Sequence, residues 1–524
     1  MRLKNPRFQA CLALAAIILF AAFVRIRLID IPLERDEGEY ALAGQLMLHG
    51  IPPYQLAWNM KFPGTYAAYA LIMAIGGQTI RAIHLGLLFV IVLSILLLYR
   101  IARGFFDRSA SLAACAAFAL FSLGTNVHGL AAHANHFVAL FALGGTLLLF
   151  RAAHTESLAR FSLSGLSFGL AVFMKQHGVL FVLFGLLWLL WSARPDLAKA
   201  VRRALAFAAG ASLPLLLTGL ILSALGVFPK FFFWTFRYAW EYTVETSLSE
   251  GWHNLLHALL DILPENPALW ALAAAGIVLL LRRRSPLLLF FLFSALAVCP
   301  GLLFRPNYFI LILPAASLLA GAALNYGIRR LGRNIPLLLF AAALASSLYQ
   351  RHDYFFRMDP FEASRFAYGI NPFPEAIKIA QYIHDRTPPE ARIAVLGSEP
   401  EIYFYADRLP ATGFIYTYGL MEHQPFALAM QNEMIRELEL ARPDYVVFVS
   451  IEYSWLMHDD SSPRIFQWWN AYSRAHYTPV GLVDLSKPFH TDYWWDDEVV
   501  QHPIPSSPHL LIERRDPDPP PIQP

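Results

Sequence analysis

The stretch "CLALAAIILFAAFVRIRLIDIPLERDEGEYALAGQLML", residues 11–48, joins an apolar run to a dense cluster of charges. A membrane-spanning helix needs about 20 mostly apolar residues, and the run approaches that length. Four carboxylates then lie close together: Glu34, Asp36, Glu37 and Glu39. The stretch therefore predicts a first membrane span near 8–24, followed by an acidic cluster at the membrane surface.

The composition of the whole chain also indicates a membrane protein. Of the 524 residues, 57% are hydrophobic and only 15% are charged, and the mean hydropathy is +0.45. A soluble domain carries about 25% charged residues. A basic end followed by an apolar run is also typical of a signal peptide, but Arg25 and Arg27 follow without a clear small-x-small cleavage site. We therefore expect an uncleaved first span.

Net charge and cysteine content argue against two other classes of protein. A net charge of +3 is too small to favour nucleic acid as a partner. The three cysteines, Cys11, Cys115 and Cys299, lie in apolar runs, where a thiol behaves as a small hydrophobic group. We expect no disulfide framework and no zinc site.

Apolar runs recur up to about residue 347 and predict a polytopic α-helical protein with about eleven spans. The spans are expected near 8–24, 80–99, 110–123, 136–150, 162–174, 178–192, 205–225, 268–281, 286–304, 308–325 and 335–348. Several runs are too short to cross a bilayer, so their helices should extend into the flanking residues.

Lysine and arginine residues alternate between the two sides of these spans. The side of the N-terminus holds roughly twice as many as the other side, which is typical of cytoplasmic segments. These residues are Arg2, Lys4, Arg7, Arg100, Arg103, Arg108, Arg151, Arg160, Arg194, Lys199, Arg202, Arg203, Arg282 to Arg284, Arg329, Arg330 and Arg333. We expect a cytoplasmic N-terminus, and an odd number of spans then puts residues 349–524 outside.

Two of the expected outer loops are long. Residues 25–78 contain the acidic cluster and "NMKFPGTYAAYALIMAIGG", whose apolar part should form a short helix at the membrane interface. Residues 226–267 contain the run "FPKFFFWTFRYAWEYTVE", and aromatic side chains favour the membrane–water boundary. Such a surface suits an enzyme whose substrate has an apolar tail and a polar head.

Residues 349–515 follow the membrane domain 1–348 and have a different pattern. We expect helices in "PEAIKIAQYIHDR", "PEIYFYAD", "AMQNEMIRELELA" and "RIFQWWNAYSRA", and strands in "ARIAVLG" and "DYVVFVS". This alternation predicts a small extracytoplasmic α/β domain with a mainly parallel sheet. Residues 516–524 are Pro-rich, and we expect a disordered tail. The chain shows no internal repeat and no GxGxxG loop.

The acidic cluster admits a structural and a catalytic interpretation. Asp36 could be a helix N-cap that pairs with Glu39 in a variant of the capping box, with Tyr40 on one face of the helix. Alternatively, one carboxylate takes the proton of an acceptor that attacks a sugar, while a neighbouring carboxylate orients the acceptor. The two interpretations are compatible, because a cap holds a carboxylate at a fixed place.

Several cationic or ionisable residues lie on the same side as the acidic cluster: Lys61, Arg81, His84, Lys175 and Arg305. A cation at the end of a span can simply reach from the helix to the membrane interface. Ionisable residues at membrane depth are also candidates for a functional site. A lipid-linked phosphate leaving group would need such cations, since they stabilise the charge that develops as the sugar departs.

Two other polar clusters carry weaker signals. "HGLAAHANH" offers His128, His133 and His136, but their spacing is not that of a standard metal site and no carboxylate sits beside them. "DYWWDDE", in the C-terminal region, offers four acids that we expect to be solvated. We assign no metal site and no cofactor, and leave metal dependence open.

Five motifs, in their order along the chain, resemble those of a known family. They are "RDEGEYA" at 35–41, "KFPG" at 61–64, "IRAIH" at 80–84, "KQHG" at 175–178 and "RPNYFILILPA" at 305–315. Together they are similar to the bacterial relatives of the dolichyl-phosphate-mannose protein mannosyltransferases, glycosyltransferase family 39, to which lipid A aminoarabinose transferases are related. The resemblance covers most of residues 1–350 and is looser over the C-terminal domain.

The resemblance implies a GT-C fold in a bacterial inner (plasma) membrane, with the active site on the outer face and the C-terminal domain periplasmic or extracellular. The reaction would move a sugar, with inversion, from a polyprenyl-phosphate donor to a lipid, polysaccharide or protein acceptor. The family's catalytic Asp-Glu pair maps to Asp36, as the general base, and Glu37.

We further expect donor-phosphate ligands at Lys61, Lys175, Arg305 and Arg81, and substrate contacts at Tyr40, His84 and Tyr308. Phe62 replaces the first proline of the family's Lys-Pro-Pro motif, so the backbone beside Lys61 should differ.

A polytopic transporter or a flippase for lipid-linked sugars is the alternative. Such a protein places ionisable residues along a path through the spans and often has repeated halves. Here the spans are nearly free of acids, and the charged groups gather at one face. If the protein is an enzyme, Asp36, Lys61 and Arg305 should instead converge on one outer cavity.

Overall fold

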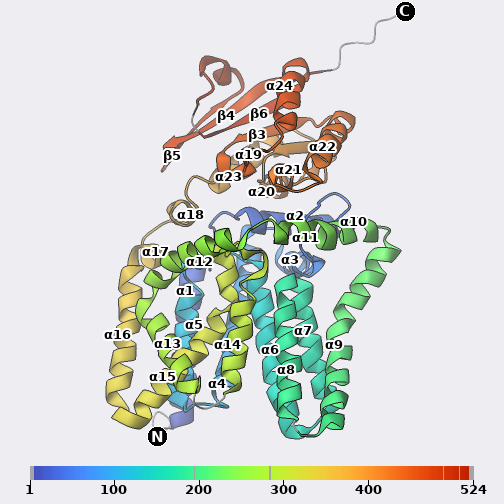
Figure 1. Ribbon diagram of the computed structural model, residues 1–524. Coiled ribbons are helices and arrows are strands. Elements are labelled where there is room, and N and C mark those ends of the chain that lie inside the picture. The colour runs from blue at the N-terminus through green and yellow to red at the C-terminus, as the bar shows by residue number, and fades with distance from the viewer. Residues whose placement is uncertain (1–4, 194, 282–284, 488, 507, 518–524) are drawn as a thin grey trace, which may run out of the picture.

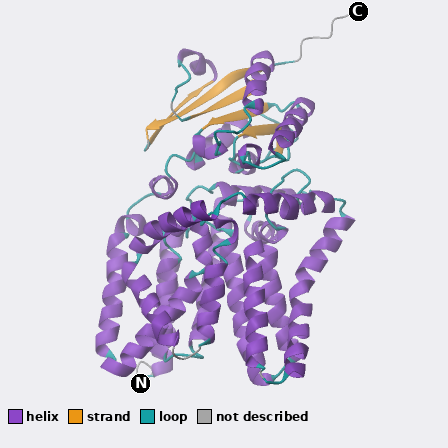
Figure 2. Cartoon of the chain, in the orientation of Figure 1, coloured by secondary structure: helices purple, strands orange, loops and turns teal. Residues whose placement is uncertain are grey.

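The computed structural model describes residues 5–193, 195–281, 285–487, 489–506 and 508–517. A bundle of apolar helices forms one part of the molecule, and a smaller domain with a six-stranded sheet lies at one end of the bundle (Figures 1 and 2). Some of the predicted features lie outside the described residues: Arg2, Lys4, Arg194, Arg282 to Arg284 and residues 518–524 of the tail.

Each predicted span corresponds to an apolar helix, so the prediction of a polytopic helical membrane protein is confirmed. The helices are α1 (Pro6–Arg27), α4 (Ile80–Ala102), α5 (Arg108–Phe121), α6 (Ala134–Thr155), α7 (Leu158–Met174), α8 (Val179–Ser192), α9 (Leu197–Ala224), α13 (Pro267–Leu281), α14 (Pro286–Leu296), α15 (Leu313–Leu331) and α16 (Asn334–Gln350). By length and composition, α1, α4, α6 and α9 can each cross a membrane alone. A bent pair that ends with α13 would add a fifth span.

Two of the expected spans, 286–304 and 308–325, are wrong at their facing ends. Helix α14 already ends at Leu296 and α15 begins only at Leu313. The short turns η6 (Pro300–Leu302) and η7 (Pro306–Leu311) lie between them. Two prolines and the positive φ of Gly301 (75°) break the helix here. This irregular backbone places polar side chains at the end of the bundle.

The bundle is tightly packed where α7 crosses α9. A Cβ atom added at Gly165 would lie 1.9 Å from the carbonyl oxygen of Phe207, and one at Gly210 would lie 1.9 Å from that of Ser162. Only glycine allows backbones to approach this closely, which is a common packing device between membrane helices. The contact holds α7 against α9, and Lys175 follows α7 as the C-cap residue before η3 (Gln176–Gly178).

Short helices cover the end of the bundle, between the spans and the C-terminal domain (Figure 1). They include α2 (Arg35–Leu48), α3 (Pro63–Gly76), η2 (Thr125–Val127), α10 (Phe228–Phe232), the π-helix η4 (Phe233–Tyr238), α11 (Ala239–Val244), α12 (Leu248–Ile262) and η5 (Leu263–Glu265). Helix α3 is the short apolar helix expected after Lys61, and α10 to α12 occupy the expected aromatic loop.

The C-terminal domain contains the predicted helices and strands. Its elements are α17 (His352–Phe356), α18 (Pro360–Tyr368), α19 (Phe373–His384), β1 (Arg392–Leu396), α20 (Glu401–Ala406), β2 (Leu409–Pro410), α21 (Tyr418–Met421), α22 (Ala427–Ala441), β3 (Tyr445–Ser450), α23 (Glu452–Trp455), α24 (Arg464–His476), β4 (Tyr477–Lys487), β5 (His490–Trp495), η8 (Asp496–Gln501) and β6 (His509–Arg515). The strand order in the sheet is β2-β1-β3-β6-β4-β5.

The expectation of a mainly parallel sheet is wrong. Strand β1 pairs in parallel with β2 and β3, whereas the β3–β6, β4–β6 and β4–β5 pairs are antiparallel. Parallel neighbours need a crossover connection, usually a helix, and helices connect β1, β2 and β3. Only two residues separate β4 from β5 in the sequence, and so short a connection allows only antiparallel pairing.

The C-terminal domain rests directly on α2. A Cβ atom added at Gly38 would lie 2.6 Å from the backbone nitrogen of Glu401, at the start of α20. The backbone nitrogen of Leu33 donates to the hydroxyl of Tyr405 at 2.9 Å. Arg35 donates to the carbonyl oxygen of Ser398 at 2.5 Å and forms an ion pair with Glu399 at 2.9 Å. The helix that follows the first span is thus held by both parts of the molecule.

Candidate active site

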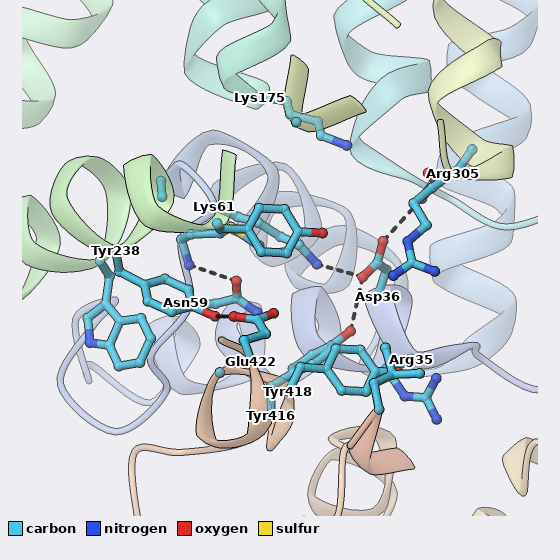
Figure 3. A pocket seen from close by; sticks show the side chains of 18 of the residues that line it. Arg35, Asp36, Asn59, Lys61, Lys175, Tyr238, Arg305, Tyr416, Tyr418 and Glu422 are labelled. Carbon is cyan, nitrogen blue, oxygen red and sulfur yellow. Dashed lines mark hydrogen bonds and ion pairs between the residues drawn. The ribbon is translucent and has the colours of Figure 1, made fainter. Parts of the chain in front are cut away.

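A cavity of about 500 Å³ lies where the bundle, the short helices and the C-terminal domain meet. Asp36, Lys61, Lys175 and Arg305 line it, although they are far apart in the sequence (Figure 3). Tyr308 also lines it. This is the convergence that the enzyme hypothesis predicts. The transporter hypothesis predicts ionisable residues along a path through the spans, whereas these residues meet at one end of the bundle.

Helix α2 begins two residues earlier than the capping interpretation assumed. Glu34 is the N-cap, and its side chain accepts from the backbone nitrogen of Glu37 at 2.9 Å. The Glu37 carboxylate in turn accepts from the backbone nitrogen of Glu34 at 3.3 Å, which completes a capping box. The prediction that Asp36 caps the helix with Glu39 is therefore wrong. Asp36 lies in the first turn, and its carboxylate is free to face the cavity.

Asp36 is surrounded by hydrogen-bond donors. Its Oδ1 accepts from Lys61 Nζ at 2.6 Å and from the hydroxyl of Tyr416 at 3.0 Å. Its Oδ2 accepts from Asn307 Nδ2 at 3.2 Å and lies 3.6 Å from His133 Nδ1. Burial by itself would raise the pKa of Asp36, but Lys61 and His133 hold it well below the usual range. The carboxylate of Asp36 is therefore ionised at neutral pH.

The second carboxylate at Lys61 is Glu39, not Glu37. Lys61 Nζ forms ion pairs at 2.6 Å with both Asp36 and Glu39. Glu39 is buried and also accepts from Asn59 at 2.9 Å and from the hydroxyl of Tyr66 at 2.5 Å. Asp36 and Glu39 are three residues apart and share one face of α2. The buried Glu39 thus fixes the lysine that contacts Asp36.

Glu37 points away from the cavity. It is 1% exposed, accepts from the backbone nitrogen of Ala132 at 2.6 Å and lies 3.2 Å from His84 Nε2. The other ring nitrogen of His84 lies 2.7 Å from the carbonyl oxygen of Ile29. Neither Glu37 nor His84 lines the cavity, so the structure does not place them as substrate contacts. Together they join α2 to α4 and to the loop before α6.

Lys175 and Arg305 bring positive charge to the cavity. Lys175 Nζ lies 4.1 Å from the centre of the Tyr308 ring, and its residue is 8% exposed. Burial lowers the pKa of Lys175 to about 7. Within the described residues, neither Lys175 nor Arg305 forms an ion pair with a carboxylate. A buried ammonium group without a counter-ion is suited to bind an anion.

Arg81 and Tyr40 do not lie where they were expected. Arg81 forms a two-point ion pair with Asp30 at 2.7 and 2.9 Å and lines a separate pocket. It does not line the cavity of Asp36, and its assignment as a donor-phosphate ligand stays a prediction. Tyr40 is buried behind Lys61, with Nζ 4.8 Å from its ring centre, and it supports the lysine without lining the cavity.

The Lys61 motif begins α3. Phe62 is the N-cap and Pro63 is the first helical residue, a position that proline favours because its missing N–H is not needed there. The carbonyl oxygen of Lys61 accepts from the hydroxyl of Tyr54 at 2.7 Å. Phe62 packs against Phe231 in α10, with ring centres 6.0 Å apart. Phe62, which stands where the family motif has its first proline, thus links the Lys61 motif to the aromatic loop.

The sequence placed no carboxylate beside His128, His133 and His136. In the structure, two carboxylates from a distant part of the chain lie beside His133. His133 Nδ1 lies 3.5 Å from Glu34 and 3.6 Å from Asp36, because α2 packs against the loop before α6. Glu34, Asp36 and His133 each offer one possible metal-ligand atom, and these three atoms lie within 4.8 Å of one another. Burial raises the pKa of Glu34 to about 7, while His133 opposes the shift. The expectation of no metal and no cofactor stays a prediction.

Several residues that line the cavity were not among those predicted from the sequence. The C-terminal domain contributes Phe414, Tyr416, Tyr418 and Glu422, and the bundle side adds Asn307. The segment "GFIYTYG", residues 413–419, has an aromatic residue at every second position from 414 to 418. Alternation of this kind predicts an extended segment with one aromatic face, and it could have been found.

Comparison with known proteins agrees with the fold. Residues 61–221 match the family model described as dolichyl-phosphate-mannose-protein mannosyltransferase. No curated protein matches the sequence. Two crystal structures of ArnT from Cupriavidus metallidurans superpose over nearly the whole chain at 15% identity. The complex with undecaprenyl phosphate has a TM-score of 0.57 and covers 96% of this chain and 97% of that one. The apo state has a TM-score of 0.58, with coverage of 97% and 98%.

A third structure is similar over a shorter part of its own length. The oligosaccharyltransferase of Archaeoglobus fulgidus, crystallised with zinc and sulfate, is 14% identical with a TM-score of 0.50. The match covers 94% of this chain and 74% of that one. The chain therefore shares the fold of ArnT and of this oligosaccharyltransferase. The family match then confirms the predicted resemblance to the dolichyl-phosphate-mannose protein mannosyltransferases.

Proposed function

We propose that this protein transfers a sugar, with inversion, from a polyprenyl-phosphate donor to an acceptor outside the cytoplasm, with Asp36 as the general base. The observation that carries the proposal is the cavity itself. The carboxylate of Asp36 lies there among Lys61, Lys175 and Arg305, at the end of a bundle of apolar helices. Two of these cations have no carboxylate partner in the described part of the chain.

The donor phosphate is assigned to the side of the cavity that the spans provide. Lys175 and Arg305 follow or precede apolar helices, so a phosphate bound there can keep its polyprenyl tail among the spans. Cations at this place stabilise the charge that develops on the phosphate as the sugar leaves. The similar fold of ArnT, crystallised with undecaprenyl phosphate, supports a donor of this class.

The chemical step needs only these residues. An acceptor hydroxyl or amine attacks the anomeric carbon from the face opposite the phosphate, and its proton passes to Asp36. The bond between the anomeric carbon and the phosphate oxygen breaks, and the phosphate leaves with the electron pair. The new glycosidic bond forms with inverted configuration.

Asp36 is a poor base while Lys61 holds it, because the nearby ammonium keeps its pKa low. A donor phosphate in the same cavity would attract the ammonium of Lys61 away from Asp36. Loss of that contact raises the proton affinity of the carboxylate. In the proposed reaction the base thus becomes effective only when the donor is present.

The test compares envelope sugars in a deletion strain that carries either the wild-type gene or Asp36→Asn. We expect one sugar modification to disappear in the deletion strain and to return with the wild type. With Asp36→Asn, transfer should fall by about 100-fold or more, while binding of undecaprenyl phosphate stays within about twofold. Asp385→Asn, an exposed change in the C-terminal domain, is the matched control. Near-normal transfer by Asp36→Asn would remove Asp36 from the role of base.

A further inference from the structure

We propose that the C-terminal domain binds a carbohydrate acceptor in a subsite formed by Tyr416, Tyr418 and Glu422. This inference rests on the proposed transfer reaction and assigns the half of the cavity that the donor leaves free. In Figure 3, Lys175 and Arg305 lie on one side of Asp36, whereas the three C-terminal residues lie on the other side. Inversion requires the acceptor and the leaving phosphate on opposite faces of the sugar. The acceptor must then lie against the C-terminal domain.

The wall of this subsite is held rigidly by the domain behind it. Side chains alternate along residues 414–418, so that Tyr416 and Tyr418 face the cavity while Ile415 and Thr417 are buried. The backbone nitrogen of Thr417 donates to the hydroxyl of Ser398 at 3.0 Å, and the hydroxyl of Thr417 donates to the carbonyl oxygen of Ser454 at 2.9 Å. The two tyrosine rings therefore have a fixed place.

Each of the three residues also has a fixed polar group. The hydroxyl of Tyr416 donates to Asp36, so its ring lies beside the proposed base. The hydroxyl of Tyr418 donates to the carbonyl oxygen of Tyr453 at 2.9 Å, and the guanidinium of Arg35 lies over its ring, 5.4 Å from the ring centre. Glu422 accepts from the hydroxyl of Tyr238, and burial raises its pKa to about 7. A carboxyl group near its pKa can accept or donate hydrogen bonds.

This chemistry matches carbohydrate. Aromatic rings offer flat apolar faces to the C–H faces of a sugar, and a carboxyl group bonds its hydroxyls. Three more aromatic side chains, Trp58, Trp234 and Phe414, continue the wall. Trp58 lies 4.9 Å from Phe414, and Trp234 lies 5.0 Å from Tyr238, between ring centres. The indole N–H groups of both tryptophans have no hydrogen-bond partner among the described residues.

An extended peptide is a poorer match to the same wall. A peptide that adds to an extended segment binds through free backbone N–H and C=O groups. Here the backbone nitrogens of Phe414 and Thr417 already donate to side chains of their own domain, and that of Ile415 donates to the carbonyl oxygen of Gly413. The segment therefore presents ring faces and a carboxyl group instead of a strand edge.

The experiment uses the full chain in lipid nanodiscs and two soluble probes. One probe is the oligosaccharide fraction released by mild acid from the envelope of the source organism, and the other is the peptide acetyl-Ala-Ser-Thr-Ala-amide. Saturation-transfer NMR and titration give binding of each. We expect the oligosaccharides to bind, and Tyr418→Ala and Glu422→Gln each to weaken binding at least tenfold. Tyr349→Ala and Glu390→Gln, exposed residues outside the cavity, are the controls.

Binding of undecaprenyl phosphate, measured on the same samples, separates this inference from the proposed function. The two subsite variants should bind the lipid like the wild type, which also shows that they are folded. Oligosaccharide binding that survives both substitutions would overturn the subsite, and so would binding of the peptide alone. If the wild type fails to bind undecaprenyl phosphate, the proposed donor is wrong, whereas the oligosaccharide titration still tests the subsite by itself.

Discussion

The two walls of the cavity are built in opposite ways. The wall on the membrane side contains cations that have no carboxylate partner in the described part of the chain, Lys175 after α7 and Arg305 before η7. The wall on the other side consists of aromatic residues fixed by a hydrogen-bonded segment of the C-terminal domain, such as Tyr416. The first is suited to a charged group that arrives through lipid. The second is suited to a polar, uncharged partner that arrives from water.

The largest effect should come from a substitution of Lys61, which lies against both walls of the cavity. In Lys61→Met, the donor phosphate loses a cation, and we expect transfer to fall by about 100-fold to 1,000-fold. The change also leaves Glu39 buried without a counter-ion, at a cost of about 3–5 kcal/mol in stability. The double variant Lys61→Met/Glu39→Gln should recover the thermal stability but not the transfer. Recovery of both would show that Lys61 is only structural.

Lys175 tests the membrane-side wall alone. Loss of a hydrogen bond to a charged group costs about 1.5–3 kcal/mol, so Lys175→Met should weaken binding of undecaprenyl phosphate by about 10-fold to 100-fold. Binding of carbohydrate to the other wall should not change. Titration of both ligands on the same sample measures the difference, and equal losses for both ligands would show that the walls are not independent.

The pKa of Lys175 gives a prediction about pH. Because burial lowers this pKa to about 7, the ammonium form is lost as the pH rises through 7. The phosphate prefers the charged form, so the affinity for undecaprenyl phosphate should be full below about pH 6 and fall as the pH rises above 7. Lys175→Arg keeps its charge and should remove this dependence. The measurement is the dissociation constant between pH 6 and 9; an unchanged slope in Lys175→Arg would exclude Lys175 as its cause.

Tyr416 tests the contact of the second wall with Asp36. Tyr416→Phe removes one donor to the carboxylate, so the pKa of Asp36 should rise. The acid limb of the pH–rate profile should then move to higher pH, while the rate near neutral pH changes by only a few-fold. A purely structural role would lower the rate at every pH without moving the limb. Tyr418→Phe, which has no bond to Asp36, is the matched comparison.

The smallest effect is expected at Arg81. Its ion pair with Asp30 is exposed and lies in another pocket, and exposed pairs contribute about 0–1 kcal/mol. Arg81→Gln should leave both transfer and lipid binding within about twofold of the wild type. A tenfold loss of lipid binding would extend the membrane-side wall to this second pocket.

The sequence was sufficient for features that depend on local composition. Apolar runs predicted the spans, and the isolated cations between them predicted most of the membrane-side wall. Prolines and a glycine shortened α14 and delayed α15, and these breaks were visible in "CPGLLFRPNYF" but were outweighed by the apolar content. The antiparallel strands at the end of the chain were missed because their pairing depends on a turn and on distant partners.

Which of Glu37 and Glu39 lies with Asp36 at Lys61 depends on where helix α2 begins. A helix that begins at Asp36 as N-cap and one that begins at Arg35 give these acids different roles. In the actual helix, Asp36 and Glu39 are three residues apart and face Lys61, while Glu37 turns to the opposite side and closes the cap. The resemblance to a family motif favoured the adjacent residues Asp36 and Glu37. Lys61 instead contacts Asp36 and Glu39, which lie on one face of α2.

Arg35 and Asp36 are neighbours in the chain, yet one is anchored in the C-terminal domain and the other is held by Lys61 of the membrane part. Any rigid rotation of the C-terminal domain therefore pulls on the peptide bond beside the proposed base. A chimera that exchanges the whole domain must retain the carbonyl group of Ser398 and the carboxylate of Glu399 to keep α2 in place. Exchange of the segment 414–422 alone retains the carbonyl group of Ser398 and the carboxylate of Glu399, and is the smaller graft with which to change the acceptor.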